Sequence, residues 1–218
     1  MPAPIRDISF SNKILIFSPE YFPVESSSVF AIKGITDNID IVKFDMITPR
    51  LRRNLPKFDR IGKVNVHRLG IGIAWIDRYI LAFFGCFFAQ RLYYQRNYSA
   101  IWGVRSDYGG LAAMDFKRKN PRVPFLLSLH DEDNPKNFRK KVALIDPWIK
   151  RIFSLADYIQ CANKDLADWA RRMGSANPIS IIPNGINFED FYRGSLRQFY
   201  IDDLKEVGLL IKQEPIQH

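Results

Sequence analysis

The chain has 218 residues, of which 47% are hydrophobic and 25% are charged. That length allows one large domain or two small ones, and the composition excludes a disordered, collagen-like or coiled-coil chain. Lys and Arg outnumber Asp and Glu by 32 to 23, which gives a formal net charge of +9. The positive excess favours an anionic partner, such as a phosphate, an acidic lipid surface or nucleic acid.

Short apolar runs and helical patterns alternate along the chain. In chain order, they predict a strand at 13–17, a helix from the serines at 26–28 to residue 38, strands at 39–46 and 64–68, a helix at 75–92, a strand at 99–104, a helix at 109–119, a strand at 123–129, a helix at 141–155 with a bend near Pro147, a strand at 158–161, a helix at 163–173, a strand at 179–182 and a helix at 196–211. Apolar runs without alternation are typical of strands buried on both faces. The pattern therefore predicts an α/β fold, a Rossmann-like parallel sheet with helices on both faces.

Two features of the chain bear on its location. Cys86 and Cys161 lie far apart in apolar stretches, which indicates neither a disulfide framework nor a metal site and fits a reducing compartment. The first twelve residues hold no apolar run of signal-peptide length. We expect a cytoplasmic protein, and a peripheral position on the inner face of the membrane is compatible with its charge.

Residues 50–68 are predicted to form a basic loop next to the aromatic helix at 75–92. The loop has seven basic residues, and Asp59 is its only acidic one. A charge run is most often a solvated face, and an aromatic helix is most often core. Together, however, they also fit a protein that meets an anionic membrane surface. Nucleic-acid binding is disfavoured because no known reader motif accompanies the charge.

Ligands of an open parallel sheet bind beyond the carboxyl ends of its strands, so the residues that follow each strand are candidates for a site. His130 follows the strand at 123–129 and could donate a hydrogen bond or move a proton near neutral pH. A solvated loop histidine beside three acidic residues is an equal alternative. Gly109 and Gly110 begin a helix whose free N–H groups fit an anion, although such a pair is more often only a turn. The dinucleotide and P-loop glycine motifs are absent.

The last third of this chain resembles a known family. Residues 155–166 (LADYIQCANKDL), Gly174 and residues 181–191 (IIPNGINFEDF) are similar to the end of the N-terminal domain in family 4 glycosyltransferases of the GT-B fold. In that family an Ala-Asp pair, a capped helix, a glycine and an Ile-Pro-Asn-Gly segment follow in the same order. The strand end Leu127-Ser-Leu-His130 also looks like the family's strand that ends in a histidine.

The resemblance implies transfer of a sugar from an activated donor, usually a nucleotide sugar, to a glycan, lipid or small-molecule acceptor. In such enzymes two Rossmann-like domains face each other across a cleft, and the N-terminal one mainly holds the acceptor. His130 matches the family's histidine near the transferred sugar and is the implied catalytic residue. The substrate-binding positions expected along the cleft are Ser26, Ser27, Gly109, Gly110 and Asn184. Neither a metal nor a cofactor is implied, since the nucleotide sugar is a co-substrate.

The chain also departs from the family pattern. Residues 24–28 (VESSS) stand where the family's first loop usually has a glycine pair, and Asp131 replaces the glycine after the histidine. We expect residues 1–194 to form the acceptor-side domain and residues 195–218 a lead-in helix and linker, with the donor-binding domain absent. Such a half would be incompetent without a donor-binding domain, and it is either a fragment or one part of a split enzyme whose donor half is a separate chain. The alternative is a non-catalytic module that kept the fold and binds a partner or a membrane surface.

Overall fold

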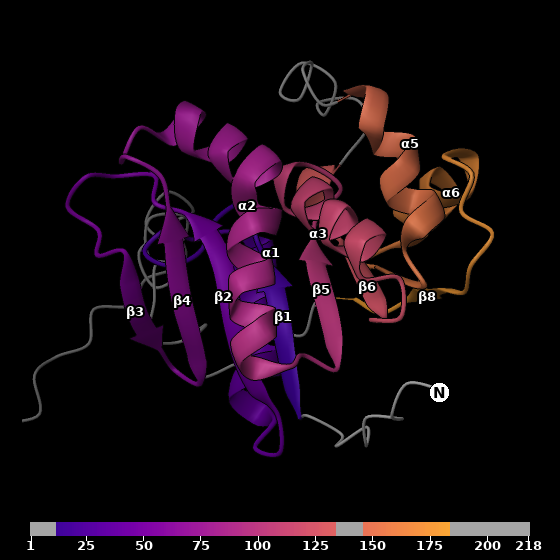
Figure 1. The fold of residues 1–218 in the computed structure, drawn as a ribbon. Coiled ribbons are helices and arrows are strands. Elements are labelled where there is room, and N and C mark those ends of the chain that lie inside the picture. Colours follow the sequence, from indigo (N-terminus) through magenta and orange to yellow (C-terminus); the bar gives the residue numbers. More distant parts are fainter. Residues whose placement is uncertain (1–11, 134–145, 184–218) are drawn as a thin grey trace, which may run out of the picture. The chain divides into compact units, whose positions relative to one another are not determined.

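The computed structural model describes residues 12–133 and 146–183 of the chain. These residues form an eight-stranded sheet in the order β3-β4-β2-β1-β5-β6-β7-β8, as Figure 1 shows. The strands are β1 (Lys13–Phe17), β2 (Lys43–Pro49), β3 (Phe58–Ile61), β4 (Val64–Leu69), β5 (Ala100–Val104), β6 (Phe125–Leu129), β7 (Tyr158–Cys161) and β8 (Ile179–Ile181). Every neighbouring pair is parallel except β3 and β4, which are antiparallel.

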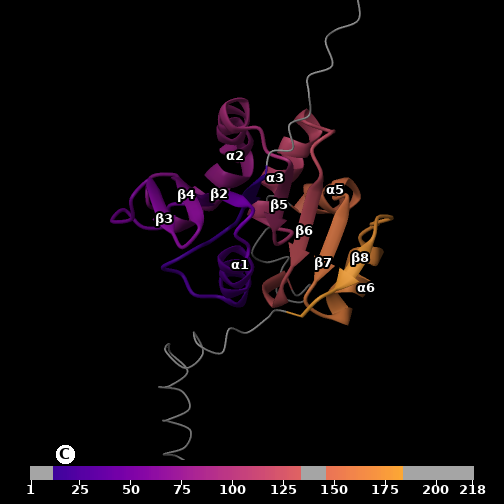
Figure 2. The same cartoon turned by 90° about the horizontal axis from the view of Figure 1, so that it is seen from below.

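Helices cover both faces of the sheet, as the alternating pattern predicts. They are α1 (Ser27–Asn38), α2 (Ala74–Arg96), α3 (Tyr108–Lys119), α5 (Asp146–Leu155) and α6 (Lys164–Arg172), with a short 3-10 turn η1 (Asp131–Asp133) after β6. Figure 2 shows α2, α3 and α5 on one face and α1 on the other, and α6 packs in the same core cluster as α2, α3 and α5. The predicted Rossmann-like α/β fold is confirmed.

The central strand β1 shows why its sequence is apolar throughout. Leu15 and Phe17 pack into the core cluster that includes residues of α2, α3 and α5, whereas Ile16 packs into the cluster that includes residues of α1. All three side chains are fully buried. Successive side chains of a strand point to opposite faces, so a strand covered on both faces must be apolar at every position.

Two predicted elements differ from the structure. Residues 50–68 do not form a loop throughout, because Phe58–Ile61 is the edge strand β3. Its charged residues, which suit an exposed edge, conceal its strand pattern. The second strand begins at Lys43 rather than at residue 39 and extends to Pro49.

The helix predicted at 141–155 is described from Asp146 onwards. Pro147 does not interrupt the helix in its described part, which continues to Leu155. Residues 141–145 and the predicted helix at 196–211 lie outside the described residues. The proposed division at residue 194 also lies outside them and stays a prediction.

The chain entering α2 is held by one buried carboxylate. Asp77, in the first turn of α2, accepts hydrogen bonds from the backbone N–H groups of Ile71 (2.8 Å), Gly72 (2.8 Å) and Leu51 (3.1 Å). Gly70 has a φ of +115°, and a Cβ there would lie 2.2 Å from the Asp77 carboxylate. Only glycine fits this close approach. Asp77 thus fixes the basic loop against the start of α2.

Replacing Asp77 tests this role. Asp77→Ala leaves three N–H groups without their acceptor, and we expect it to lower the free energy of unfolding by about 3 kcal/mol. Urea denaturation measures the loss. Asp168→Ala, which removes an exposed carboxylate from α6, is the control and should change stability by less than about 0.5 kcal/mol. An equal, small effect of both substitutions would contradict the role given to Asp77.

Candidate functional site

The sheet has a topological switch point between β1 and β5. From β1 the chain moves outward through β2 and β4, and it then returns to place β5 on the other side of β1. The loops after β1 and β5 therefore diverge toward opposite sides of the sheet. A crevice at the carboxyl ends of such strands is where open α/β sheets bind ligands.

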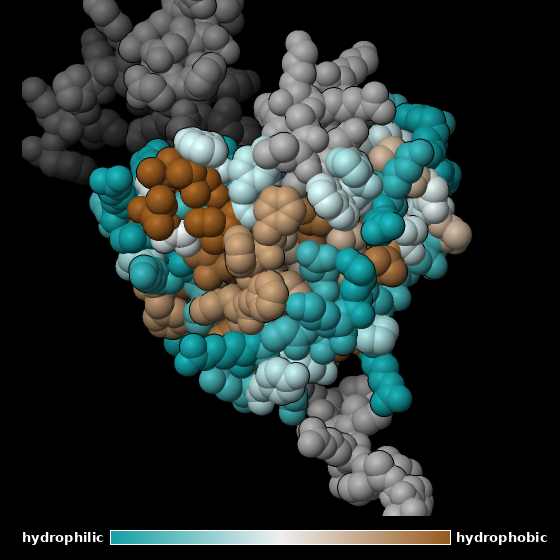
Figure 3. All heavy atoms as spheres, turned by 45° about the horizontal axis from the view of Figure 1, so that its top comes forward, coloured by the Kyte–Doolittle hydropathy of each residue, from teal (hydrophilic) through white to brown (hydrophobic). Residues whose placement is uncertain are grey.

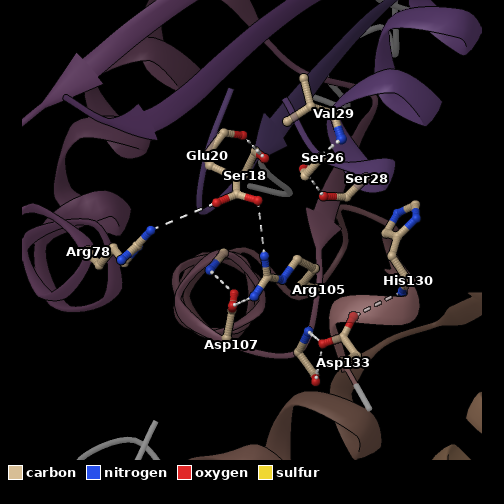
Figure 4. A network of polar contacts seen from close by, with 12 residues as sticks. Ser18, Glu20, Ser26, Ser28, Val29, Arg78, Arg105, Asp107, His130 and Asp133 are labelled. Carbon is tan, nitrogen blue, oxygen red and sulfur yellow. Dashed lines mark hydrogen bonds and ion pairs between the residues drawn. The ribbon is translucent and has the colours of Figure 1, made fainter. Parts of the chain in front are cut away.

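Arg105 joins these two loops. It follows β5 with a φ of +66°, and its side chain is largely buried. Its Nη1 lies 3.3 Å from Glu20 Oε1 in the loop after β1, and its Nη2 lies 2.7 Å from Asp107 Oδ2. The second oxygen of Glu20 lies 3.8 Å from Nη2 of Arg78 in α2. Figure 4 shows this chain of ion pairs crossing the switch point.

Asp107 also begins α3. Its carboxylate accepts a hydrogen bond from the N–H of Gly109 at 3.4 Å, so it is the N-cap of the helix. Burial raises the pKa of this carboxyl to about 6, although Arg105 opposes the shift. A carboxylate therefore already occupies the end of α3 where an anionic ligand would bind.

A second group of hydrogen bonds holds His130 at the end of β6. Oδ2 of Asp133 accepts from the N–H of His130 at 3.0 Å, and its Oδ1 accepts from the N–H and the hydroxyl of Ser106, both at 2.8 Å. Burial raises the pKa of the Asp133 carboxyl, while Arg105 and these hydrogen bonds lower it. Asp133 thus ties the loop after β6 to the loop after β5.

The imidazole of His130 is only 2% exposed, so it is not a solvated loop histidine. Its Nε2 lies 3.2 Å from the hydroxyl oxygen of Ser128, which accepts from the indole N–H of Trp102 at 2.8 Å. These contacts fix the ring from the strand side. Figure 4 shows the ring on the side of the site where Ser26 and Ser28 lie. The catalytic role of His130 stays a prediction.

The predicted substrate-binding serines lie at the start of α1. Ser26 is its N-cap, and its hydroxyl accepts from the N–H of Val29 at 3.4 Å and lies 3.0 Å from that of Ser28. Ser27 is exposed on the first turn. The structure thus brings Ser26 and Ser27 to the same edge of the sheet as His130. Asn184 lies outside the described residues.

Gly109 and Gly110 are buried at the first turn of α3. A Cβ on Gly109 would lie 2.5 Å from the carbonyl oxygen of Val104, and one on Gly110 would lie 2.5 Å from that of Arg105. Close packing of the helix on the sheet therefore requires both glycines. Their part in binding a substrate stays a prediction.

Sequence reasoning did not single out Glu20, Arg105, Asp107 or Asp133. Asp107 carried a usable signal, since an aspartate directly before a helix is a strong N-cap residue. The pair of Glu20 and Arg105 spans 85 positions of the chain, so only the fold reveals it. Asp131, which replaces the family's glycine, is exposed and accepts a hydrogen bond from Asn163 at 2.9 Å.

Comparisons with known proteins agree with this architecture. The model of Glycosyltransferase Family 4 matches residues 41–190. The chain belongs to glycosyltransferase family 4. No curated protein matches the chain in sequence.

Two solved transferases share the fold of this family 4 chain. A sucrose-phosphate synthase structure from Thermosynechococcus elongatus aligns with a TM-score of 0.54 at 15% identity, over 88% of this chain and 98% of that one. The α,α-trehalose 6-phosphate synthase from Burkholderia multivorans aligns with a TM-score of 0.51 at 10% identity, over 89% of this chain and 53% of that one. The chain thus spans about half of the second enzyme. Both are structures of the GT-B type.

Within residues 12–133 and 146–183, no group of three His, Cys, Asp or Glu side chains is placed to hold a metal ion. In the same part of the chain, no helix has the length and hydropathy needed to cross a membrane.

The raised pKa of Asp107 predicts a pH dependence of stability. A carboxyl that holds its proton more tightly in the folded state stabilises the fold when protonated, and this contribution is lost as pH rises through the folded pKa of about 6. Asp107→Asn cannot titrate. The unfolding free energy of the wild type minus that of the variant should therefore fall between pH 4 and pH 7. Urea denaturation across this range measures the difference, and a flat or rising difference would contradict the assigned pKa.

Proposed function

We propose that residues 1–194 are the acceptor-side domain of a glycosyltransferase, which transfers a sugar from a nucleotide-sugar donor to a glycan, lipid or small-molecule acceptor. The observation that best supports this proposal is the position of His130. Its imidazole is held by the Ser128 side chain at the carboxyl edge of the sheet, beside the switch point between β1 and β5. Open α/β sheets bind ligands at that edge.

The charges of the site suit an acceptor with hydroxyl groups. Glu20 and Asp107 neutralise Arg105, and the Asp107 carboxylate caps the first turn of α3. A free phosphate would gain little binding energy from the N-terminus of α3, since the Asp107 carboxylate already occupies that helix end. Serine hydroxyls and an imidazole can both donate and accept hydrogen bonds, which is what sugar hydroxyls require.

The reaction itself develops charge that fixed dipoles can stabilise. Breaking the bond between the sugar and the phosphate builds positive charge on the sugar ring and negative charge on the leaving phosphate. Preorganised hydrogen-bond partners lower this barrier because they need no reorientation during the step. In this proposal His130 orients the transferred sugar, and Ser26 and Ser27 contact the substrate. The nucleotide is bound mainly by a donor-binding domain, without which the acceptor-side domain is not a competent transferase. No metal or cofactor takes part, and the reaction occurs in the cytoplasm.

Acceptor binding tests the site directly. A thermal-shift panel of free sugars, sugar phosphates and short-chain polyprenyl-phosphate-linked sugars identifies a binder, whose affinity is then measured by calorimetry. His130→Ala should weaken that affinity about tenfold, because one buried hydrogen bond is lost. His67→Ala is the matched control, since His67 lies on β4 between the rings of Phe58 and Phe88 and should leave the affinity unchanged.

A transfer assay separates the proposed enzyme from a non-catalytic module with the same fold. Mixing the chain with a donor-binding domain should give sugar transfer that His130→Ala lowers by about two orders of magnitude. An unchanged rate in this variant would remove His130 from the mechanism. Turnover of a nucleotide sugar by the chain alone would contradict the need for a separate donor lobe. Absence of both binding and transfer would favour the non-catalytic module.

A further inference from the structure

Helix α2 has one buried face and one exposed aromatic face. Leu81, Gly85 and Ala89 lie in the contact with the rest of the domain. Phe84 (60%) and Phe87 (63%) on the opposite side are mostly exposed, and so is Trp75 (67%), which lies in the first turn of the helix. Figure 3 shows apolar surface gathered across one face and bordered by hydrophilic surface. One side of the helix therefore packs in the core, and its other side forms an apolar surface of the molecule.

Basic side chains border this aromatic face at both ends. At its start, the loop before β3 lies against the helix, since Arg52 forms a β-bridge with Ile73, and Arg52 and Arg53 are exposed. Farther along α2, Arg91 is exposed and lies at helical spacing from Phe84 and Phe87.

The neighbouring helix α3 adds another cation. Lys119 is exposed at its end, and its Nζ lies 4.2 Å from the centroid of the Phe87 ring. A cation over an aromatic ring keeps both groups together at the surface. The apolar face and its basic border thus form one continuous feature.

Carboxylates balance these cations only in part, since Asp115 of α3 lies 3.5 Å from Arg118 and also attracts Lys119. Asp77 is the single acidic residue of α2, and it is fully buried with its oxygens turned to backbone N–H groups. An aromatic face whose border carries more cations than carboxylates is typical of helices that lie in the headgroup region of a membrane. Tryptophan is enriched at that depth.

We infer that the exposed face of α2 docks on an anionic lipid surface. The aromatic side chains enter the headgroup region, and the flanking Arg and Lys residues contact the lipid phosphates. The same charges argue against a second copy of the chain as the occupant. A two-fold contact through this face would place Arg52, Arg53, Arg91 and Lys119 opposite their own copies, and like charges facing each other are destabilising.

Vesicle sedimentation with the full chain tests this inference. The probes are vesicles of phosphatidylcholine alone and vesicles with one third phosphatidylglycerol, in about 50 mM and 500 mM salt, a range over which screening differs strongly. We expect binding to the anionic vesicles at low salt, at least tenfold weaker binding at high salt, and no binding to phosphatidylcholine alone. Absence of binding to anionic vesicles at low salt would overturn the inference.

Two pairs of variants locate the surface. Arg52→Glu/Arg53→Glu should weaken vesicle binding on the order of 100-fold, since each reversal replaces an attraction with a repulsion. Arg171→Glu/Arg172→Glu on α6, which packs near the β8 edge of the sheet and away from α2, should change it less than threefold. Phe84→Ala/Phe87→Ala should weaken binding at least tenfold. Its control is Ile41→Ala/Ile181→Ala, which removes exposed apolar groups elsewhere.

Circular dichroism and thermal unfolding confirm that each variant is folded before its vesicle binding is compared. Equal binding by the α2 variants and their controls would contradict the inference. So would a concentration-dependent dimer that the Phe84→Ala/Phe87→Ala variant disrupts, or binding of duplex DNA in place of vesicles. None of these experiments depends on sugar transfer, so this inference and the proposed transferase activity stand or fall separately.

Discussion

The geometry of the site depends on one largely buried cation, Arg105. A guanidinium out of water is tolerated only where carboxylates compensate the loss of its hydration. Here one carboxylate comes from the loop after β1 and the other from the N-cap of α3. These groups hold the loops on both sides of the topological switch point at a fixed separation. Arg105 reaches them from a backbone with positive φ, which places its side chain where a right-handed conformation would not.

The same arginine also affects the position of His130, which follows a different strand, β6. Asp133 accepts from the backbone of His130 and from the backbone and side chain of Ser106, the residue directly after Arg105. The position of the imidazole therefore depends on the loop that Arg105 holds. A catalytic or binding histidine must be held within a fraction of an ångström to be effective. The buried hydrogen bonds around His130 provide that restraint before any substrate arrives.

Local signals in the sequence predicted most of the fold. The apolar run at 13–17 and the capping serine at residue 26 mark β1 and α1, and Asn163 marks the start of α6. These features act within a few residues, so the sequence shows them. The edge strand β3 was missed because an exposed strand of four residues with two charges has no apolar pattern.

The candidate site was predicted only in outline. The rule that ligands bind at carboxyl ends led to the loops that the structure brings together after β1, β5 and β6, and within them to His130 and Ser26, whose roles stay predictions. The contact of Glu20 with Arg105 joins residues 85 positions apart, and no spacing rule encodes such a pair. Likewise, helical periodicity in α2 did not show which aromatic residues stay exposed, because every face of this helix carries apolar side chains. That distinction depends on what packs against the helix.

Amide hydrogen exchange in an Arg105→Met variant tests the central claim most directly. Methionine keeps much of the buried volume but leaves the Glu20 and Asp107 carboxylates without their shared cation. If Arg105 holds the site, the amides of Ser106, Gly109 and His130 will exchange on the order of 100-fold faster than in the wild type, as expected for a broken buried ion pair, while the amides of β1 and β2 keep their protection. Unchanged exchange at those three amides would contradict the account.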